Sequence, residues 1–358
     1  MESMRSINID KDYKVVVGCL TYNHSKYIVD ALNGFAMQQT DFPFACIVMD
    51  DASTDGEPEV IKDWLQKECD MNRAEYYDLE LANVVIAPHL KNANCTMAIY
   101  LLKRNLYEEA STKFDIVKGW ADHCEYLALC EGDDYWIDSE KLQIQSDCLD
   151  THPEVDMCSH SYLEKHAVSD KIIKHKYFQK SNCIIQTPTV ISVEGSLLAT
   201  DSIMLRKELF YSIPDFRRIM DYDYTLYIHG SLKGGIIYIH RYMSVYRRFV
   251  PGSWSINLAS NEMFHKDFVQ KRNYMLDILD KETGGKFHQC IQQRKMLNLL
   301  ELPKTPVSKL KVVQNNKNLM EDLSLYEKSV IVCKCISPRL GHLIVNVFKV
   351  LNLTISYV

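Results

Sequence analysis

A series of short apolar runs, each ending in a polar turn and followed by a helical pattern, constrains the fold of this chain more than any other feature. The runs at residues 13–20 (YKVVVGCL) and 44–49 (FACIVM) are nearly continuous, which is typical of strands that are covered on both faces. Shorter runs at residues 84–87 and 126–130 repeat the pattern. Because helices separate these strands, we expect an α/β fold with a doubly wound, mostly parallel sheet.

The pattern changes along the rest of the chain. The stretch from residue 92 to 122 is mainly helical in pattern, and beyond Met157 the sequence indicates shorter strands and loops. From Asn261 onward the spacing of apolar residues is typical of helices. We therefore predict one domain over residues 1–255 and a helical C-terminal region over residues 256–358.

Composition and charge argue against several classes of protein. Hydrophobic residues make up 47% of the 358 residues and charged residues 25%, which is typical of a globular chain. Lys and Arg number 41 and Asp and Glu 47, so the net charge is −6 and we do not expect a nucleic-acid partner. The N-terminus lacks the apolar segment of a signal peptide, and no run reaches the roughly 18 apolar residues of a membrane span.

Cysteine usage and the C-terminus bear on location. The 12 cysteines are scattered without the spacing of a disulfide framework or a zinc site, which predicts reduced thiols in a cytoplasmic protein.

Residues 340–358 are strongly apolar but are interrupted by Asn346, Lys349 and Asn352. A docking helix and a shallow helix on the membrane surface both fit this pattern, and the second would place the protein at the inner face of the membrane.

Polar residues follow three of the four predicted strands. The turn after the first strand is Thr21-Tyr22-Asn23, the second strand runs into Asp50 and Asp51, and the fourth leads into an acidic turn at residues 131–136. The carboxyl ends of parallel strands meet at one edge of the sheet, and ligands of open α/β sheets bind there. We therefore expect a ligand site at this edge.

The residues of these turns suit a nucleotide that is bound together with a metal ion. No GxGxxG or GxxxxGK[ST] loop follows the first strand, which disfavours a Rossmann dehydrogenase and a P-loop enzyme. Asp51 can accept a hydrogen bond from a base. Asp133 and Asp134 offer the carboxylate oxygens that Mg²⁺ and Mn²⁺ prefer, and such an ion would neutralise the phosphates. A solvated acidic turn is the alternative for this pair.

Four separate blocks of the sequence, spread over residues 15–255, resemble the family 2 glycosyltransferases, which have a GT-A fold. They are VVVGCLTYNHSKYI, MDDASTDG, LALCEGDDYWIDSEKLQIQ and DYDYTLYIHGSLKGGIIYIHRYMSVYRRFVPGSWS. The third block is similar to one bacterial branch, in which the acidic pair is a DXD-type metal site. The resemblance implies an inverting transfer of a sugar, such as a hexose, from a nucleotide-diphosphate sugar to an acceptor hydroxyl. The implied setting is the synthesis of a bacterial surface polysaccharide or glycan.

The resemblance also assigns roles to residues and partners. The donor would be a UDP-sugar or a related nucleotide sugar, and the acceptor a glycan or a lipid-linked molecule. Asp133 and Asp134 would hold Mn²⁺ or Mg²⁺ with the donor phosphates, with Asp134 as the direct ligand. The residues that would line the donor pocket are Thr21, Tyr22, Asn23, Asp50 and Asp51, the last in contact with the base.

The resemblance places the catalytic carboxylate at Asp223. This position follows from aligning residues 234–236 (Gly-Gly-Ile) with the Gly-x-Ile of the family. Inversion needs a single base on the face opposite the leaving group, and a carboxylate can supply it. Capping of the following helix is compatible with that role, and Asp221 is the second candidate for the base.

The sequence departs from this branch after the MSVYR motif. Phe249 stands where the branch has a His, which makes Arg247 and Arg248 the candidates for an additional phosphate contact.

Two other functions are compatible with acidic residues at strand ends. A nucleotidyltransferase also sets acidic metal ligands after strands, and a non-catalytic relative would bind a nucleotide or glycan without reaction. The products separate these functions, because a glycosyltransferase releases a nucleoside diphosphate, a nucleotidyltransferase releases pyrophosphate, and a binding protein releases neither.

Overall fold

The structure is a computed structural model that describes residues 7, 9–107, 109–194, 197–220, 222–251 and 262–336. Three predictions lie outside these residues: the membrane-surface helix at residues 340–358, the second candidate base Asp221, and the end of the fourth sequence block at residues 252–255. Within the described helices, we find no segment with the length and apolar character needed to cross a bilayer.

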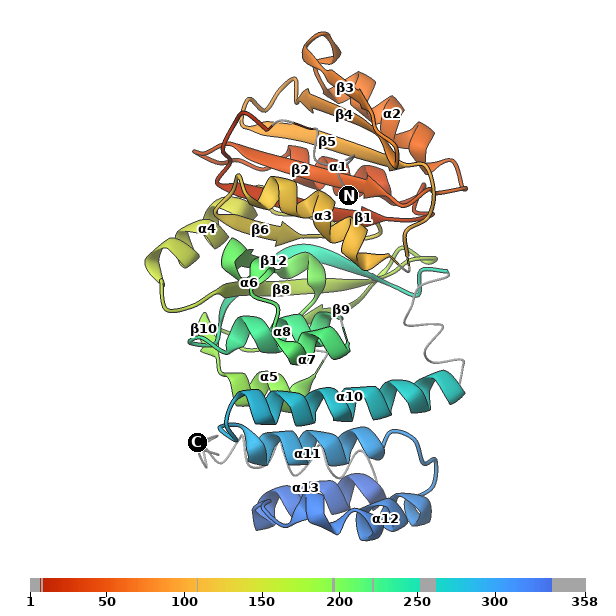
Figure 1. Cartoon of the computed structure of the whole chain (residues 1–358), viewed down its shortest axis with the longest axis vertical. Coiled ribbons are helices and arrows are strands. Elements are labelled where there is room, and N and C mark those ends of the chain that lie inside the picture. Colours follow the sequence, from red (N-terminus) through yellow and green to blue (C-terminus); the bar gives the residue numbers. More distant parts are fainter. Residues whose placement is uncertain are drawn as a thin grey trace. The chain divides into compact units, whose positions relative to one another are not determined.

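Strands and helices alternate along the first part of the chain, and helices alone make up its last part (Figure 1). The strands are β1 (Val15–Thr21), β2 (Phe44–Asp50), β3 (Glu75–Asp78), β4 (Ala82–Pro88), β5 (Cys95–Leu102), β6 (Tyr126–Leu129), β7 (Tyr135–Trp136), β8 (Met157–His166), β9 (Ile172–Lys176), β10 (Cys183–Ile185), β11 (Met204–Arg206) and β12 (Ile236–Arg248). The helices are α1 (Ile28–Ala36), α2 (Glu57–Glu68), α3 (Ala110–Ala121), α4 (Lys141–Thr151), α5 (Thr187–Val193), α6 (Lys207–Tyr211), α7 (Asp215–Ile219), α8 (Asp223–Ser231), α10 (Glu262–Glu282), α11 (His288–Leu299), α12 (Pro306–Asn315) and α13 (Leu325–Ile336).

The strands form one twelve-stranded sheet with a parallel centre. Its order is β10-β12-β8-β11-β6-β1-β2-β5-β4-β3, with β7 added to β12 and β9 added to β8. Strands β6, β1, β2 and β5 run parallel to one another, whereas β4, β3 and β11 pair in the antiparallel sense. The predicted α/β class with a doubly wound sheet is confirmed, and antiparallel strands extend the parallel centre on both sides.

Two segments of the sheet differ from the sequence prediction. The mainly helical pattern expected from residue 92 to 122 is wrong for its first part, because Cys95–Leu102 forms β5, which lies between β2 and β4. Only Ala110–Ala121 is helical there. Beyond Met157 the prediction was of short strands, but β8 spans Met157–His166 and pairs with the 13-residue strand β12 over most of its length.

Helices cover both faces of the parallel centre. Val15, Val17 and Cys19 of β1 pack in the main hydrophobic cluster, to which α1, α2 and α4 contribute their apolar side chains. On the opposite face, Trp120 of α3 donates a hydrogen bond from Nε1 to the hydroxyl of Tyr100 in β5 at 2.9 Å. Because successive side chains of a strand point to opposite faces, β1 and β5 are buried on both sides, as their nearly continuous apolar sequences require.

The chain forms two compact units. The first contains Met1–Ile185, Gly195–Ser212 and Gly230–Val250, and it holds the whole sheet. The second contains Gln186–Glu194, Ile213–His229 and Pro251–Val358. The predicted boundary at residue 255 stays a prediction.

The second unit is helical throughout its described part. Helix α10 packs against α7 and α11, and α11 also packs against α5. A second hydrophobic cluster stabilises the helices that follow, and its buried members are Met296, Leu300, Leu319, Leu323, Ile331 and Cys335. The helices expected from residue 261 onward are thus present, and they share one unit with the short helices α5 and α7 and most of α8.

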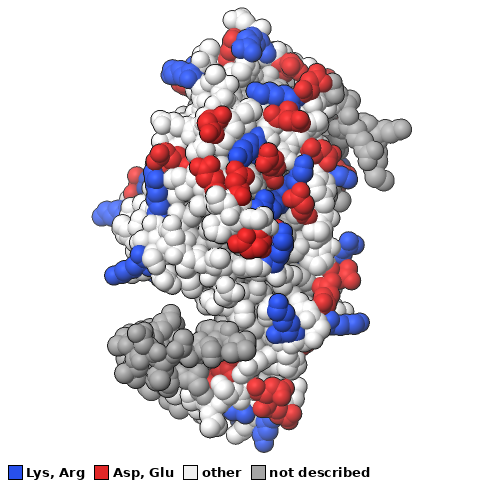
Figure 2. All heavy atoms as spheres, turned by 90° about the vertical axis from the view of Figure 1, so that its left-hand side faces the viewer, with Lys and Arg blue, Asp and Glu red and all other residues white. Residues whose placement is uncertain are grey.

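Charged side chains of both signs are scattered over the face of the protein shown in Figure 2. On the face shown in Figure 2, Lys and Arg are interspersed with Asp and Glu, and neither sign gathers into a large continuous area of the described residues. All 12 cysteines are free thiols in the structure.

Candidate active site

The turns after β1 and β2 form the first part of the candidate site and are joined by hydrogen bonds. The two strands are parallel neighbours, and their last residues, Thr21 and Asp50, lie opposite each other. In the turns that follow, the backbone N–H of Asn23 donates to Ser53 Oγ at 2.8 Å, and Asn23 Oδ1 accepts from the backbone N–H of Thr54 at 2.8 Å. Asn23 has a φ of 57°, a left-handed conformation that Asn tolerates better than most residues.

Glu57, which no sequence motif indicated, joins these two turns through its carboxylate. Its side chain is fully buried at the start of α2. One carboxylate oxygen accepts a hydrogen bond from the hydroxyl of Thr21, and the other accepts from the backbone N–H of His24 at 2.8 Å and from Ser53 Oγ at 2.9 Å. A buried carboxylate with this many donors orders the loops around it, so Glu57 supports the expected nucleotide-binding edge without facing a ligand.

The acidic turn after β6 packs directly onto the end of β1. The backbone N–H of Gly132 donates to the carbonyl of Leu20 at 2.9 Å. A Cβ atom at Gly132 would lie 2.1 Å from Thr21 Oγ1, so only glycine fits at this position. On the other side of the contact, His24 Nε2 lies 3.8 Å from Asp133 Oδ2. The structure therefore brings the turns after β1, β2 and β6 together, as the parallel topology predicted.

Three carboxylates of the acidic turn lie close enough to share a metal ion. One carboxylate oxygen from each of Glu131, Asp133 and Asp134 can be chosen so that all three atoms lie within 4.8 Å of one another. Asp134 is fully buried, and its Oδ2 has no hydrogen-bond partner among the described residues. Oxygen ligands of this kind suit Mg²⁺ and Mn²⁺, so the residues present fit a hard divalent cation. Glu131 is an addition to the predicted pair of ligands.

The protonation of Asp134 depends strongly on its surroundings. Burial raises the pKa of this carboxyl well above its usual value, and the nearby carboxylates of Asp133, Asp201 and Glu131 raise it further. The backbone N–H of Arg247, which donates to Asp134 Oδ1 at 2.6 Å, acts in the opposite direction. A buried carboxyl among other carboxylates takes up a proton more readily than an exposed one, and a cation bound beside it would oppose this.

The guanidinium of Arg247 binds groups of the protein itself and holds the acidic turn in place. Its guanidinium is almost completely buried, donates to the Asp133 carbonyl at 2.6 Å and pairs with the carboxylate of Asp30 in α1. It also lies over the rings of Tyr27 and Tyr135, with 4.9 and 4.4 Å to the ring centroids. Because these contacts use the guanidinium, the expectation that Arg247 contacts a phosphate is not supported by the arrangement of its side chain.

Asp50, the first carboxylate at the tip of β2, is buried and only partly satisfied. It is 1% exposed, its Oδ2 accepts from the backbone N–H of Ser53 at 3.2 Å, and its Oδ1 has no hydrogen-bond partner among the described residues. Burial raises the pKa of this carboxyl to about 6, and the hydrogen bonds from Ser53 lower it only in part. Asp50 Oδ1 is thus a buried acceptor at the strand tip without a hydrogen-bond donor among the described residues.

Asp51, which follows β2 and was expected to contact the base of the donor, has its own partners. Its Oδ1 accepts from the backbone N–H of Leu106 at 2.6 Å, and its Oδ2 pairs with Lys113 of α3 at 2.7 Å. The side chain of Asn105 donates to the Asp51 carbonyl at 3.0 Å. Lys113 lies 62 residues away in the sequence, and nothing in the local pattern indicated this ion pair.

The remaining predicted residues are Tyr22 and Asp223. Tyr22 is 44% exposed in the turn after β1, where its ring is accessible to a ligand. Asp223 is the first residue of α8 and lies in the second unit, whereas all the other predicted site residues lie in the first. Its side chain is exposed.

The mixed α/β fold of this chain matches that of solved GT-A glycosyltransferases. Residues 17–80 match the sequence model of the family described as glycosyl transferase family 2. This match confirms the resemblance to family 2 glycosyltransferases over the stretch that contains the first two of the four sequence blocks.

Solved structures support the same fold. Residues 1–349 of TarS from S. aureus in complex with UDP-GlcNAc superimpose with a TM-score of 0.52 at 15% identity, covering 90% of this chain and 79% of that one. The complex of the same protein with UDP has a TM-score of 0.50, also at 15% identity, and covers 91% of this chain and 82% of that one. At this level of identity the likeness concerns the fold.

Curated relatives exist in mycobacteria. Two uncharacterized proteins, one from Mycobacterium tuberculosis and one from Mycobacterium bovis, are each 32% identical over 236 residues, which is 66% of this chain. The match spans 59% of the length of those relatives.

Proposed function

We propose that this protein is an inverting glycosyltransferase that moves a hexose from a UDP-sugar to an acceptor hydroxyl with the help of Mn²⁺ or Mg²⁺. The observation that carries the proposal is the meeting of three polar turns at one edge of the sheet, with Glu131, Asp133 and Asp134 within reach of a single cation. Such an edge binds ligands in open α/β folds, and the adjacent carboxylates supply a DXD-type site for the diphosphate.

Each turn has a task in this proposal. The turns that contain Thr21, Tyr22 and Asn23 and the strand tip at Asp50 line the pocket for the nucleoside. Asp51 reaches the base only if a ligand competes with Lys113, so it acts either as a direct contact or as the residue that fixes this wall of the pocket. A cation held by the acidic turn would stabilise the negative charge of the departing diphosphate.

Asp223 is the proposed general base. Inversion requires a base that takes the proton of the acceptor hydroxyl as the oxygen attacks the anomeric carbon. The family resemblance of residues 234–236 assigns this role, and an exposed carboxylate at the first residue of α8 is accessible to an acceptor. We retain residues 1–255 as the proposed glycosyltransferase domain.

The proposed setting is the cytoplasmic side of a bacterial membrane, where surface polysaccharides and glycans are assembled on lipid-linked acceptors. Twelve free thiols support a reducing compartment. The acceptor would then be a glycan or a lipid-linked sugar.

The test is an assay of the nucleotide product. The full chain is incubated with UDP-glucose, UDP-galactose or UDP-GlcNAc and Mn²⁺, and the release of UDP is followed with and without short glycan acceptors. The proposal expects UDP release that requires metal and falls at least about a hundredfold in Asp223→Asn. Asp147→Asn, which removes an exposed carboxylate of α4, is the matched control and should retain full activity.

Two outcomes would contradict the proposal. Release of pyrophosphate from a nucleoside triphosphate in the presence of a sugar phosphate would identify a nucleotidyltransferase. Binding of UDP-sugars without release of any product, with all donors and acceptors tried, would identify a binding protein that lacks the chemistry.

A further inference from the structure

The segment that carries the candidate base is anchored on both sides of Asp223. Before it, the ring of Tyr222 packs edge-on against Phe268 of α10, with 5.3 Å between ring centroids. After it, the hydroxyl of Tyr224 donates a 2.6 Å hydrogen bond to the carbonyl of Ile191 in α5. Tyr224 is almost completely buried. The position of the base along α8 is therefore determined by contacts with two other helices of the second unit.

Glu194, at the end of α5, has an unusual backbone and a paired side chain. Its φ is 60° and its ψ −167°, a region that residues other than glycine adopt only where the surroundings impose it. One carboxylate oxygen pairs with Arg272 of α10, and the other lies 2.9 Å from Arg294 of α11. Strain of this kind is found where a precise backbone position serves a site.

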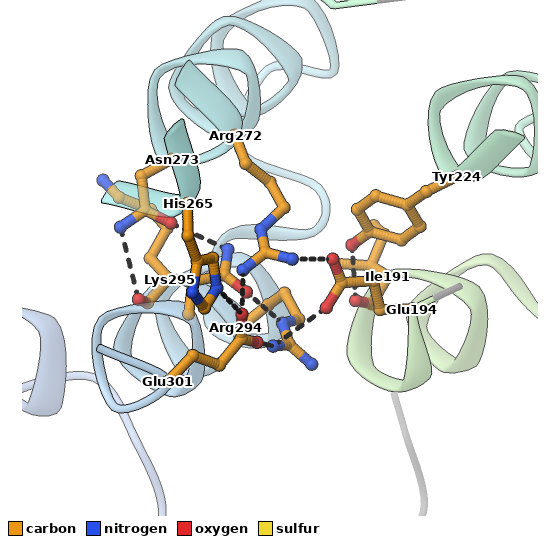
Figure 3. Close-up of polar contacts among 10 residues, drawn as sticks. Ile191, Glu194, Tyr224, His265, Arg272, Asn273, Arg294, Lys295 and Glu301 are labelled. Carbon is orange, nitrogen blue, oxygen red and sulfur yellow. Dashed lines mark hydrogen bonds and ion pairs between the residues drawn. The ribbon is translucent and has the colours of Figure 1, made fainter. Parts of the chain in front are cut away.

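The two arginines form a closed cluster with Glu194 and Glu301 (Figure 3). Arg272 and Arg294 are 4% and 8% exposed, and Glu301 pairs with them at 2.5 and 2.7 Å. Figure 3 shows both guanidinium groups between the two carboxylates, with Tyr224 and Ile191 on the far side of Glu194. Two cations and two anions balance one another in charge, so the cluster is not arranged to bind an anion, although Arg272 Nε has no hydrogen-bond partner among the described residues.

The orientation of Arg294 is itself fixed by a hydrogen-bond chain between α10 and α11. Arg294 Nε donates to Asn298 Oδ1 at 2.6 Å, and Asn298 Nδ2 donates to Asn273 Oδ1 at 2.8 Å. Asn298 is fully buried. Because its Nε is held in this way, the guanidinium of Arg294 is fixed in one orientation, in which its terminal nitrogens face Glu194.

We propose that Arg272 and Arg294 are positioning residues for the candidate base, acting through Glu194. The path runs from the arginines to the Glu194 carboxylate, along the end of α5 to the Ile191 carbonyl, and through the Tyr224 hydroxyl to the first turn of α8. The helices α10 and α11 thus contribute to catalysis by holding Asp223, the candidate base, in position rather than by contacting a substrate. This inference rests on the proposed function, in which Asp223 is the base.

The test uses two variants of the full chain that interrupt the path at different points. Glu194→Gln keeps the shape of the side chain and removes its charge, and Tyr224→Phe removes only the hydroxyl bonded to Ile191. Lys295→Gln is the matched control, because Lys295 joins the same helices α10 and α11 through Asp277 without reaching α5. Hydrogen exchange of residues 222–229, kcat, and KM for the UDP-sugar are measured for each.

We expect faster exchange at residues 222–229 in both variants and no change in Lys295→Gln. We also expect kcat to fall about ten- to a hundredfold, because a misplaced catalytic group costs rate, while KM for the donor changes less than about twofold. Tyr224→Phe, which loses a single hydrogen bond, decides the matter if Glu194→Gln does not fold.

Each readout has an outcome that overturns the inference. Unchanged exchange at residues 222–229 in a folded variant would show that the cluster does not hold this segment, whatever the activity. Faster exchange with unchanged kcat would show that the segment does not position the base. If the wild-type protein transfers no sugar, the proposed function fails, and faster exchange in the variants would then leave a structural link without a catalytic role.

Discussion

Replacing Asp50 by Asn is expected to make the first unit more stable at neutral pH. The carboxyl is 1% exposed, and one of its oxygens has no hydrogen-bond partner. Burial raises its pKa from 3.8 to about 6. The folded protein therefore resists the ionisation that the unfolded chain undergoes freely, and Asn removes this conflict because it never carries a charge.

The size of the effect follows from the two pKa values. The difference between 3.8 and about 6, at about 1.4 kcal/mol for each pH unit, corresponds to about 3 kcal/mol. A raised pKa in the folded state stabilises the wild type below pH 3.8, and this contribution is lost as the pH rises through 6. The advantage of Asp50→Asn in free energy of unfolding should therefore grow by about 3 kcal/mol between about pH 3 and pH 7.5.

Urea unfolding of both proteins at several pH values measures this directly. Comparing wild type and variant at each pH cancels the titration of all other groups. Asp147→Asn, at an exposed carboxylate, serves as the control and should differ from wild type by less than about 0.5 kcal/mol throughout. An advantage of Asp50→Asn that stayed constant or shrank with rising pH would refute the argument that burial destabilises the charged carboxylate.

Three further predictions concern the packing of the site and the division of the chain. Gly132→Ala should destabilise the first unit by about 1–3 kcal/mol, because its Cβ collides with the end of β1, whereas Gly119→Ala, whose Cβ meets no atom within 4 Å, should not; urea unfolding compares them. Lys113→Met should lower the free energy of unfolding by about 2–3 kcal/mol, because it leaves the Asp51 carboxylate without its cation. Lys103→Met, which breaks an exposed ion pair, should lower it by less than about 0.5 kcal/mol. Equal losses in the two variants would contradict this reasoning. A chain truncated after residue 255 keeps the first unit, which should still melt cooperatively, whereas α5 and α7 lose their packing against α11 and α10 and should exchange their amide hydrogens faster than in the full chain; equal exchange in the two chains would contradict this reasoning.

In the parallel centre of the sheet, β1, β2 and β6 could be predicted because each is a nearly continuous apolar run, whereas β5 of the same centre and the long strand β8 lack this pattern. β5 (CTMAIYLL) is buried on both faces and therefore shows no alternation, and its Met, Ala and Leu residues are also good helix formers. β8 begins with the sequence MCSHS, in which buried polar residues interrupt the apolar pattern that is typical of a central strand. Ser159 bonds to Ser202 Oγ at 2.7 Å and Ser161 to the Tyr238 hydroxyl at 2.6 Å, and such distant partners leave no local signal.

The same limit applies to the candidate site. The acidic turns could be located because each follows a buried strand directly, and parallel topology then brings them together. The partners that decide what each carboxylate can do come from far along the chain. Lys113 of α3 neutralises Asp51, and Arg247 of β12 closes the acidic turn 113 residues away from Asp134. Local sequence patterns predict where a carboxylate stands, whereas its charge partner depends on tertiary packing.

Thermal-shift titration with UDP, GDP and CDP, each with and without Mn²⁺, tests the central claim most directly when wild type and Asp134→Asn are compared. A ligand present at 100 times its dissociation constant stabilises a protein by about 2.7 kcal/mol, which a melting curve resolves. The account predicts a shift with UDP that requires Mn²⁺ and is absent in Asp134→Asn. A UDP shift of equal size without metal, or one that survives in Asp134→Asn, would contradict the claim that the acidic turn after β6 holds a cation for the donor diphosphate.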